Sequence, residues 1–97
     1  MSVSRNQLLV LRYLAGRSAP VAGIDVSADL DWVPTSSIYA AISALQARGM
    51  IAAKWDHSKS HPRRMISLNK VGAAAIKEAE EIEDKIARAV RLQDIRL

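Results

Sequence analysis

The stretch TSSIYAAISALQARGMIAAKWDHSKSHPRRMISL, residues 35–68, decides the fold of this chain. Its first half carries large aliphatic residues at intervals of four and three, the spacing of one buried helical stripe: Ile38, Ile42 and Leu45. Pro34 suits the start of a helix, and Gly49 is typical of the residue that follows a helix end. The pattern therefore predicts a helix over residues 35–48.

A β-hairpin is expected directly after this helix. Residues 50–56 alternate between apolar and other side chains, as a half-buried strand does. The loop over residues 57–63 contains Pro62, which blocks strand pairing. Residues 64–68 then predict a return strand, and Trp55 is expected to cover the hairpin base or a partner helix.

Positive charge is concentrated around this hairpin. The chain has 97 residues and a net charge of +4, and residues 48–70 contain six cationic side chains against one anionic side chain, Asp56. From residue 70 to the end, six cations balance six anions. A concentrated basic patch favours a polyanionic partner. A helix sized for the major groove, beside a basic hairpin that meets phosphates, is the arrangement by which a winged-helix domain holds DNA.

Two further helices are predicted before this stretch. Residues 5–15 have an apolar stripe, and Ser4 with Gln7 matches a capping box at their start. A second helix is expected over residues 23–30, with Trp32 packed in the turn behind it. Three residues are expected to form the inward apolar side of this second helix: Ile24, Val26 and Leu30.

Asn69 is expected to cap a long final helix that continues to about residue 96. Such a helix spans roughly 40 Å, so its distal half needs a packing partner. Acidic residues precede basic ones, and two antiparallel copies would pair opposite charges. We expect a homodimer formed by the small and aliphatic residues of this helix: Ala79, Ile82, Ile86, Ala89 and Val90.

The fold class expected is therefore mainly α with a small β-hairpin: a winged helix-turn-helix with a long C-terminal dimerisation helix. A winged-helix DNA-binding domain is expected over residues 1–69. The dimerisation helix, residues 70–97, is expected to belong to the same structural unit.

The candidate DNA-binding residues fall into two groups. Small, hydroxyl and amide side chains lie on the outward face predicted for the third helix: Thr35, Ser36, Ser37, Tyr39, Ala40, Ser43 and Gln46. Cations at the end of that helix and on the hairpin are expected to meet phosphates: Arg48, Lys54, Lys59, Arg63 and Arg64. The centre of the helix has no Arg to read guanine, so we expect modest sequence discrimination and a large electrostatic share.

Composition argues against several other classes of protein. Without any Cys, the chain has no disulfides or thiolate metal sites, which fits a reducing cytoplasm. No apolar run approaches the roughly 20 residues that cross a bilayer, so no membrane partner is expected. The consecutive residues Asp56, His57 and Ser58 cannot easily converge as a triad. His57 and His61 have no obvious further ligand for zinc. We expect no enzyme, no metal and no cofactor.

Two motifs in the chain are similar to those of a known protein family. The region from Leu8 to about Ile76 resembles the PadR family of transcriptional regulators. In SSIYAAISALQARGMI, the positions similar to the family's recognition helix are Ser37, Ile38, Tyr39, Ile42, Leu45, Gly49 and Ile51. In RRMISLNKVG, the positions similar to its strand and helix cap are Arg64, Leu68, Asn69 and Gly72. The chain departs from the family at Ile24 in place of Tyr, at Asn69 in place of Thr, and at Ile66 in place of an aromatic residue. MarR-like and ArsR-like regulators remain alternatives.

The resemblance implies a dimeric repressor that binds double-stranded DNA. Tyr39 and the start of its helix would then meet the DNA, and the hairpin arginines would meet phosphates or the minor groove. Effector pockets in such dimers often lie between the long helices and the core, but the sequence identifies no small-molecule effector. The alternative function is a protein–protein or architectural accessory module, of the kind that phages and mobile elements encode, without sequence-specific DNA binding.

Overall fold

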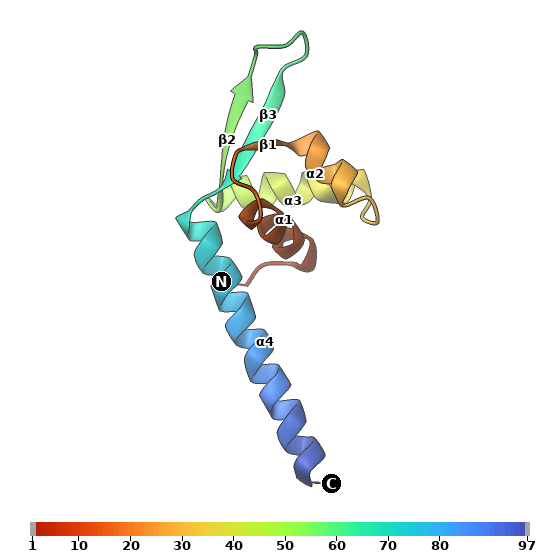
Figure 1. Ribbon diagram of the computed structural model, residues 1–97, viewed down its shortest axis with the longest axis vertical. Helices are drawn as coiled ribbons and strands as arrows, with labels where there is room; N and C mark the ends of the chain where they lie inside the picture. Colours follow the sequence, from red (N-terminus) through yellow and green to blue (C-terminus); the bar gives the residue numbers. More distant parts are fainter. Residues whose placement is uncertain (1, 97) are drawn as a thin grey trace.

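The computed structural model describes the backbone of residues 2–96 and the side chains of residues 2–92. Three short helices and a small antiparallel sheet form a body, and a long fourth helix leaves it (Figure 1). The prediction of a mainly α fold with a small β-hairpin is confirmed. In chain order the elements are α1 (Arg5–Ala15), β1 (Val21–Ala22), α2 (Gly23–Asp29), α3 (Thr35–Ala47), β2 (Ile51–Asp56), β3 (Arg63–Leu68) and α4 (Lys70–Arg96).

The predicted cap residues are present at the start of α1 and at the end of α3, although α2 and α3 each end one residue earlier than predicted. Ser4 and Gln7 form a capping box, with the Ser4 hydroxyl accepting from the Gln7 amide nitrogen at 3.2 Å. Gly49 has a positive φ of 70°. Glycine adopts this left-handed conformation without strain because it has no Cβ. The Met50 amide donates to the Leu45 carbonyl at 3.0 Å, the long bond of a Schellman motif. Gly49 and the Met50 bond turn the chain sharply from α3 into β2.

The sheet has three strands in the order β1-β3-β2, all antiparallel. The two-residue strand β1 pairs with Met65 and Ile66 in the middle of β3. In the hairpin, Ala53 pairs with Ile66 and Trp55 pairs with Arg64, so these four side chains share one face. Ile66 is completely buried against the helices, which identifies this face as the inner one.

A single aliphatic core lies between the helices and the sheet. It is formed by the fully buried side chains Val10, Leu11, Val26, Ile38, Ile42, Leu45 and Ile66. Two apolar residues were predicted wrongly, because Ile24 is 59% exposed and Trp32 is 65% exposed. The helix α2 has only seven residues, and Val26 with Leu30 already forms its buried stripe. Ile24 lies roughly 200° around the helix from Val26, so it faces outward.

The junction of β3 and α4 is held closely against the end of α3. The Asn69 side chain accepts from the Gly72 amide at 3.0 Å and donates to the Gly49 carbonyl at 2.8 Å, so one amide caps α4 and ties it to α3. A Cβ at Gly72 would overlap the Met50 carbonyl oxygen. Only glycine lets the first turn of α4 approach this closely.

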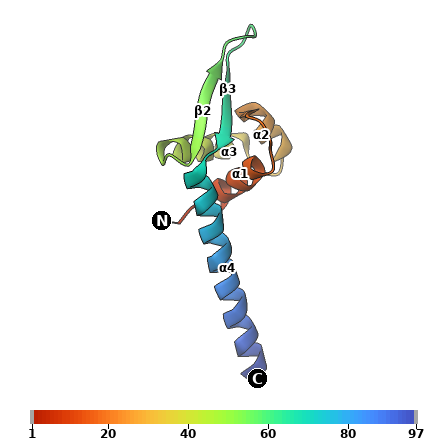
Figure 2. The same ribbon diagram turned by 60° about the vertical axis from the view of Figure 1, so that its left-hand side comes forward.

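The remainder of α4 separates progressively from the body. Ala75 is buried, and further along the helix Glu83 forms an ion pair with Arg12 of α1 at 3.1 Å. Figures 1 and 2 show α4 extending away from the hairpin, and the molecule measures 63 Å along this direction. Among the described residues, no helix is long and apolar enough to cross a membrane.

Candidate nucleic-acid interface

The outward face of α3 is open to solvent and polar. Its buried stripe is formed by Ile38, Ala41, Ile42 and Leu45. The face opposite is formed by side chains that are all exposed: Thr35, Ser36, Ala40, Ser43 and Gln46. Ser37 and Tyr39 are half-buried at its edge. Because these side chains are short, another molecule could approach the backbone of α3 closely.

Tyr39 is half-packed, as its place at the edge of this face predicts. Its ring lies against the start of α2, where a Cβ at Gly23 would come within 3.3 Å of the Tyr39 ring. The lack of a side chain at Gly23 therefore leaves room for the Tyr39 ring.

The first turn of α3 is fixed to α2 by hydroxyl groups. The Ser27 hydroxyl donates to the Thr35 hydroxyl oxygen at 3.2 Å. Ser27 is the buried polar residue of the core region, with 8% of its surface exposed. The bond supplies a partner to a buried hydroxyl, which would otherwise be costly. It also holds Thr35 and Ser36 at the tip of the helix-turn-helix.

The basic hairpin stands beside this polar face. Lys54, Lys59 and Arg63 are exposed, and Arg64 is half-buried. The Arg64 guanidinium donates to the Gln46 side-chain oxygen at 3.4 Å, which joins β3 to α3. Arg64 therefore joins the polar face of α3, whereas Lys54 projects from the other face of the hairpin.

The turn at the start of the hairpin loop is ordered by a local contact. The Asp56 carboxylate accepts a hydrogen bond from the Ser58 backbone amide at 2.9 Å. This bond lowers the pKa of Asp56 below its usual value, because it favours the ionised carboxylate. The rings of Trp55 and His57 stack with centroids 6.5 Å apart. Both contacts stiffen the strand that carries Lys54.

Arg48, predicted to contact DNA, is directed elsewhere by the fold. Its guanidinium donates to the Gln7 side-chain oxygen at 2.8 Å and to the Ser2 carbonyl at 3.0 Å. These contacts tie the end of α3 to the start of α1. Arg48 therefore stabilises the body, and the structure does not bring it together with the hairpin cations.

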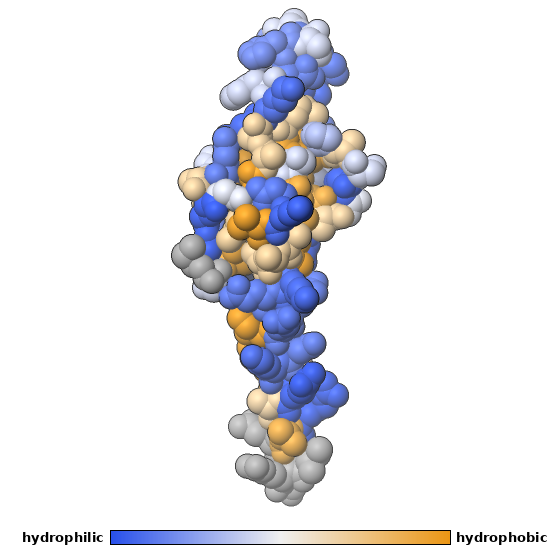
Figure 3. All heavy atoms as spheres, turned by 90° about the vertical axis from the view of Figure 1, so that its left-hand side faces the viewer, coloured by the Kyte–Doolittle hydropathy of each residue, from blue (hydrophilic) through white to orange (hydrophobic). Residues whose placement is uncertain are grey.

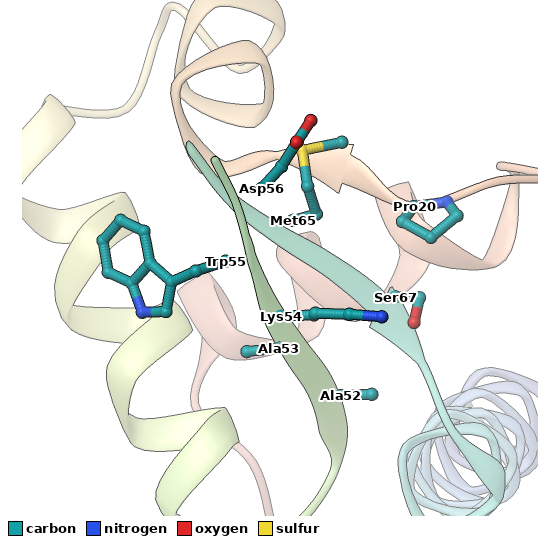
Figure 4. Close-up of a pocket in the computed structure, with 8 residues that line it drawn as sticks. All are labelled: Pro20, Ala52, Ala53, Lys54, Trp55, Asp56, Met65 and Ser67. Atoms are coloured by element: carbon teal, nitrogen blue, oxygen red, sulfur yellow. The ribbon is translucent and has the colours of Figure 1, made fainter. Parts of the chain in front are cut away.

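The two faces of the hairpin carry different side chains. Figure 4 shows Trp55 projecting from β2 toward α3, whereas Lys54 and Ser67 project to the other side. With Trp55 57% exposed, the inner face beyond the core is apolar as well as basic. This combination was not predicted, because it depends on the hairpin register that pairs Trp55 with Arg64.

A second open surface lies on α4. Small and aliphatic residues recur there at intervals of three and four, which is the seam of a coiled coil: Ala79, Ile82, Ile86, Ala89 and Val90. Ile82, Ile86 and Val90 are 45%, 60% and 51% exposed. Figure 3 shows hydrophobic atoms continuing from the body along α4 among hydrophilic ones. We call these five residues the α4 seam.

No metal-binding cluster is present among the described residues, since no three His, Asp or Glu side chains converge there. The residues brought together on α3 and the hairpin are hydroxyls, an amide and guanidinium or ammonium groups. Such a set offers hydrogen bonds and positive charge to a ligand. It lacks the paired nucleophile and base from which catalytic sites are built.

Four helices and a hairpin wing in this order form the winged helix-turn-helix fold, and comparison with solved structures confirms it. A PadR-family transcriptional regulator from Eggerthella lenta matches with a TM-score of 0.76 and 22% identity, over 90% of this chain and 79% of that one. A MepR A103V mutant from S. aureus matches with a TM-score of 0.77 and 18% identity, over 94% and 64% of the two chains. Bacillus subtilis PadR in complex with operator DNA matches with a TM-score of 0.65 and 18% identity, over 74% and 44%.

These likenesses establish a PadR-like winged-helix fold, and the structural neighbours are transcriptional regulators and not enzymes. The chain spans less than two thirds of the length of the MepR and Bacillus subtilis PadR chains. No family model matches the sequence, and no curated protein matches it by sequence.

Proposed function

We propose that this protein is a transcriptional regulator that binds double-stranded DNA as a homodimer and represses the genes it binds. The helix α3 enters the major groove, and the hairpin lies on the adjacent backbone. One observation carries the proposal: the exposed polar face of α3 lies beside the basic hairpin, and the contact of Arg64 with Gln46 at 3.4 Å joins the two. The operator complex of Bacillus subtilis PadR, which shares the fold, supports it.

The two parts of this surface have different tasks. Ser43, Gln46 and Ala40 lie on the exposed centre of α3, where a hydroxyl, an amide and a methyl group can meet base edges. Thr35, Ser36, Ser37 and Tyr39 lie at its start and edge, where their hydroxyls can donate to phosphates. Discrimination between sequences is modest, because no cation projects from the centre of the helix.

Affinity comes mainly from the hairpin. Lys54, Lys59, Arg63 and Arg64 supply four cations per subunit, and neutralising phosphates releases condensed counterions. Arg48 contributes indirectly, by holding α3 against α1 through Gln7. Replacing both Arg63 and Arg64 with Ala should weaken binding to all sequences alike, whereas replacing Gln46 should alter the preference between sequences.

The α4 seam joins two copies. Its apolar side chains are exposed in the single chain, and α4 is roughly 40 Å long, so a second copy would bury a continuous stripe. Dimerisation doubles the phosphate contacts and places one α3 in each half-site. A protein with this function would act on DNA in the cytoplasm.

A mobility shift with random duplex at low salt tests the proposal. We expect retardation at micromolar protein, and a log–log dependence on salt with a slope near −7 if about eight phosphates are neutralised per dimer. Retardation that is absent at these concentrations would contradict DNA binding. It would favour the protein–protein module, for which the same polar face of α3 would be the contact surface.

A further inference from the structure

The strand β2 forms one edge of the sheet. It pairs with β3 on one side, and the order β1-β3-β2 leaves its other side without a strand in the described part of the chain. Figures 1 and 2 show the hairpin projecting beyond the helices, with no other element beside the distal half of β2 on this side. A free edge presents backbone N–H and C=O groups to another strand, and β2 contains no Pro or Gly that would prevent such pairing.

The outer face of this edge carries one cation and one anion side by side. Lys54 and Asp56 are two residues apart on β2, so both project to the face opposite Trp55. With Met65 and Ser67 they line a shallow hollow of about 560 Å³ (Figure 4). Neither charge has an ion-pair partner among the described side chains of its own chain. Both charges are therefore available to a second molecule.

This pair of charges is self-complementary under two-fold symmetry. If two β2 strands pair antiparallel with Trp55 opposite Trp55, Lys54 faces the partner's Asp56 and Asp56 faces the partner's Lys54. A shift of one residue places each charge opposite an uncharged side chain or His57. A shift of two residues places one charge opposite its own copy. Because opposite charges stabilise a cross-strand pair and like charges destabilise it, the charges select a single register.

The same register suits the shape of the hairpin. It pairs residues 54–56, in the half of β2 that is distant from the helices, and the antiparallel direction places the two bodies at opposite ends of the paired strands. Trp55, which is 57% exposed in the single chain, would gain an aromatic cross-strand partner on the inner face. Charge, exposure and shape thus favour the same contact.

We propose that β2 pairs with the β2 strand of a second copy, antiparallel and centred on Trp55, so that two hairpins form one continuous sheet. The α4 seam lies at the other end of the molecule, which is 63 Å long, so one chain can use both contacts. Two such two-fold contacts link dimers into larger assemblies. Pairing engages Lys54 but leaves Lys59, Arg63 and Arg64 for phosphates, so neighbouring dimers would bind one duplex cooperatively. This last consequence rests on the proposed function, whereas hairpin pairing does not.

The contact is tested in a full-length chain with a broken α4 seam. This seam variant carries Ile82→Asp and Ile86→Asp, at side chains that are 45% and 60% exposed in the single chain, so its body should fold. Sedimentation equilibrium should show a monomer–dimer equilibrium with a dissociation constant on the order of 0.1 mM, because so small a contact is weak. No association at about 1 mM protein would overturn the proposal.

Nuclear magnetic resonance locates the contact in the same ¹⁵N-labelled variant. The amide signals of residues 54–56 and the indole N–H signal of Trp55 should shift with protein concentration. The indole signal of Trp32, which is 65% exposed on another surface, should stay fixed. Association without shifts in β2 would contradict the proposal. A wild-type chain that forms only this weak dimer would contradict the seam in the proposed function, while supporting hairpin pairing.

Charge reversal tests the register. Added to the seam variant, either Lys54→Asp or Asp56→Lys places like charges opposite each other and should weaken self-association roughly thirtyfold. An equimolar mixture of the two restores opposite charges at both positions, so it should associate as the seam variant does. The matched control is Lys59→Asp, which changes the net charge as Lys54→Asp does but lies in the loop, and should leave the dissociation constant unchanged. A mixture that associates no better than its components, or equal weakening by Lys59→Asp, would refute the register.

Discussion

The two halves of α4 belong to one helix but have different surroundings. In the first half, Gly72 and Ala75 are buried against the body, and Asn69 ties the helix start to Gly49. In the second half, every described side chain beyond Ala79 is exposed, including large aliphatic ones. In the single chain, α4 is buried only where it lies against the body. The difference therefore locates where a second molecule is needed, and substitutions in each half can test it.

The largest effect is expected at the junction, with Gly72→Ala. The new methyl group would overlap the Met50 carbonyl oxygen, so α4 would have to move away from β2 and the core. We expect the free energy of unfolding to fall by about 3 kcal/mol, as for overpacking of a close contact. Urea denaturation measures it, with Val71→Ala, at a neighbouring position that is 52% exposed, as the control. Equal stability of the two variants would show that the first turn of α4 is not fixed to the body.

The next largest effect is expected on the α4 seam, with Ile86→Asp. A carboxylate in the centre of an apolar interface is costly to desolvate. The dimer dissociation constant should rise by about a hundredfold, or about 2.7 kcal/mol, as measured by sedimentation equilibrium.

The matched control is Ala87→Asp, which adds the same charge one residue further and off the seam. We expect this control to remain a dimer. The unfolding of the body should change little in Ile86→Asp, since Ile86 is 60% exposed in the single chain. If both variants remain dimeric, the seam is not the interface between copies.

The smallest effect is expected where the two halves meet, with Arg12→Ala. The ion pair of Arg12 with Glu83 joins side chains that are 42% and 56% exposed. Exposed pairs contribute only about 0–1 kcal/mol, so stability should fall by less than about 1 kcal/mol. Thermal unfolding at low and high salt would measure it. A loss above about 2 kcal/mol would mean that this contact, and not the buried Gly72 and Ala75, fixes α4 to the body.

Local chemistry explains why much of the fold was predictable from the sequence. The capping box of Ser4, the Gly49 helix stop and the Asn69 cap each depend on neighbouring residues, and all three were confirmed. The helical stripe of α3 was confirmed for the same reason. Its opposite face had to be polar and exposed once the period of the buried residues was known.

Long-range contacts explain what the sequence did not reveal. The pairing of Arg48 with Gln7 joins residues that are 41 positions apart, and no local pattern indicates it. The strand β1 has two residues, too few for an alternating pattern. The outward direction of Ile24 depends on Val26 and Leu30 having already formed the narrow buried stripe of α2.

The salt dependence of duplex binding tests the central claim most directly. We expect a log–log slope near −7 for the wild-type dimer, and a slope near −4 once Arg63→Ala and Arg64→Ala remove about four of eight phosphate contacts. A wild-type slope shallower than about −2, or a double variant with the slope of the wild type, would contradict DNA binding by the hairpin and α3 together.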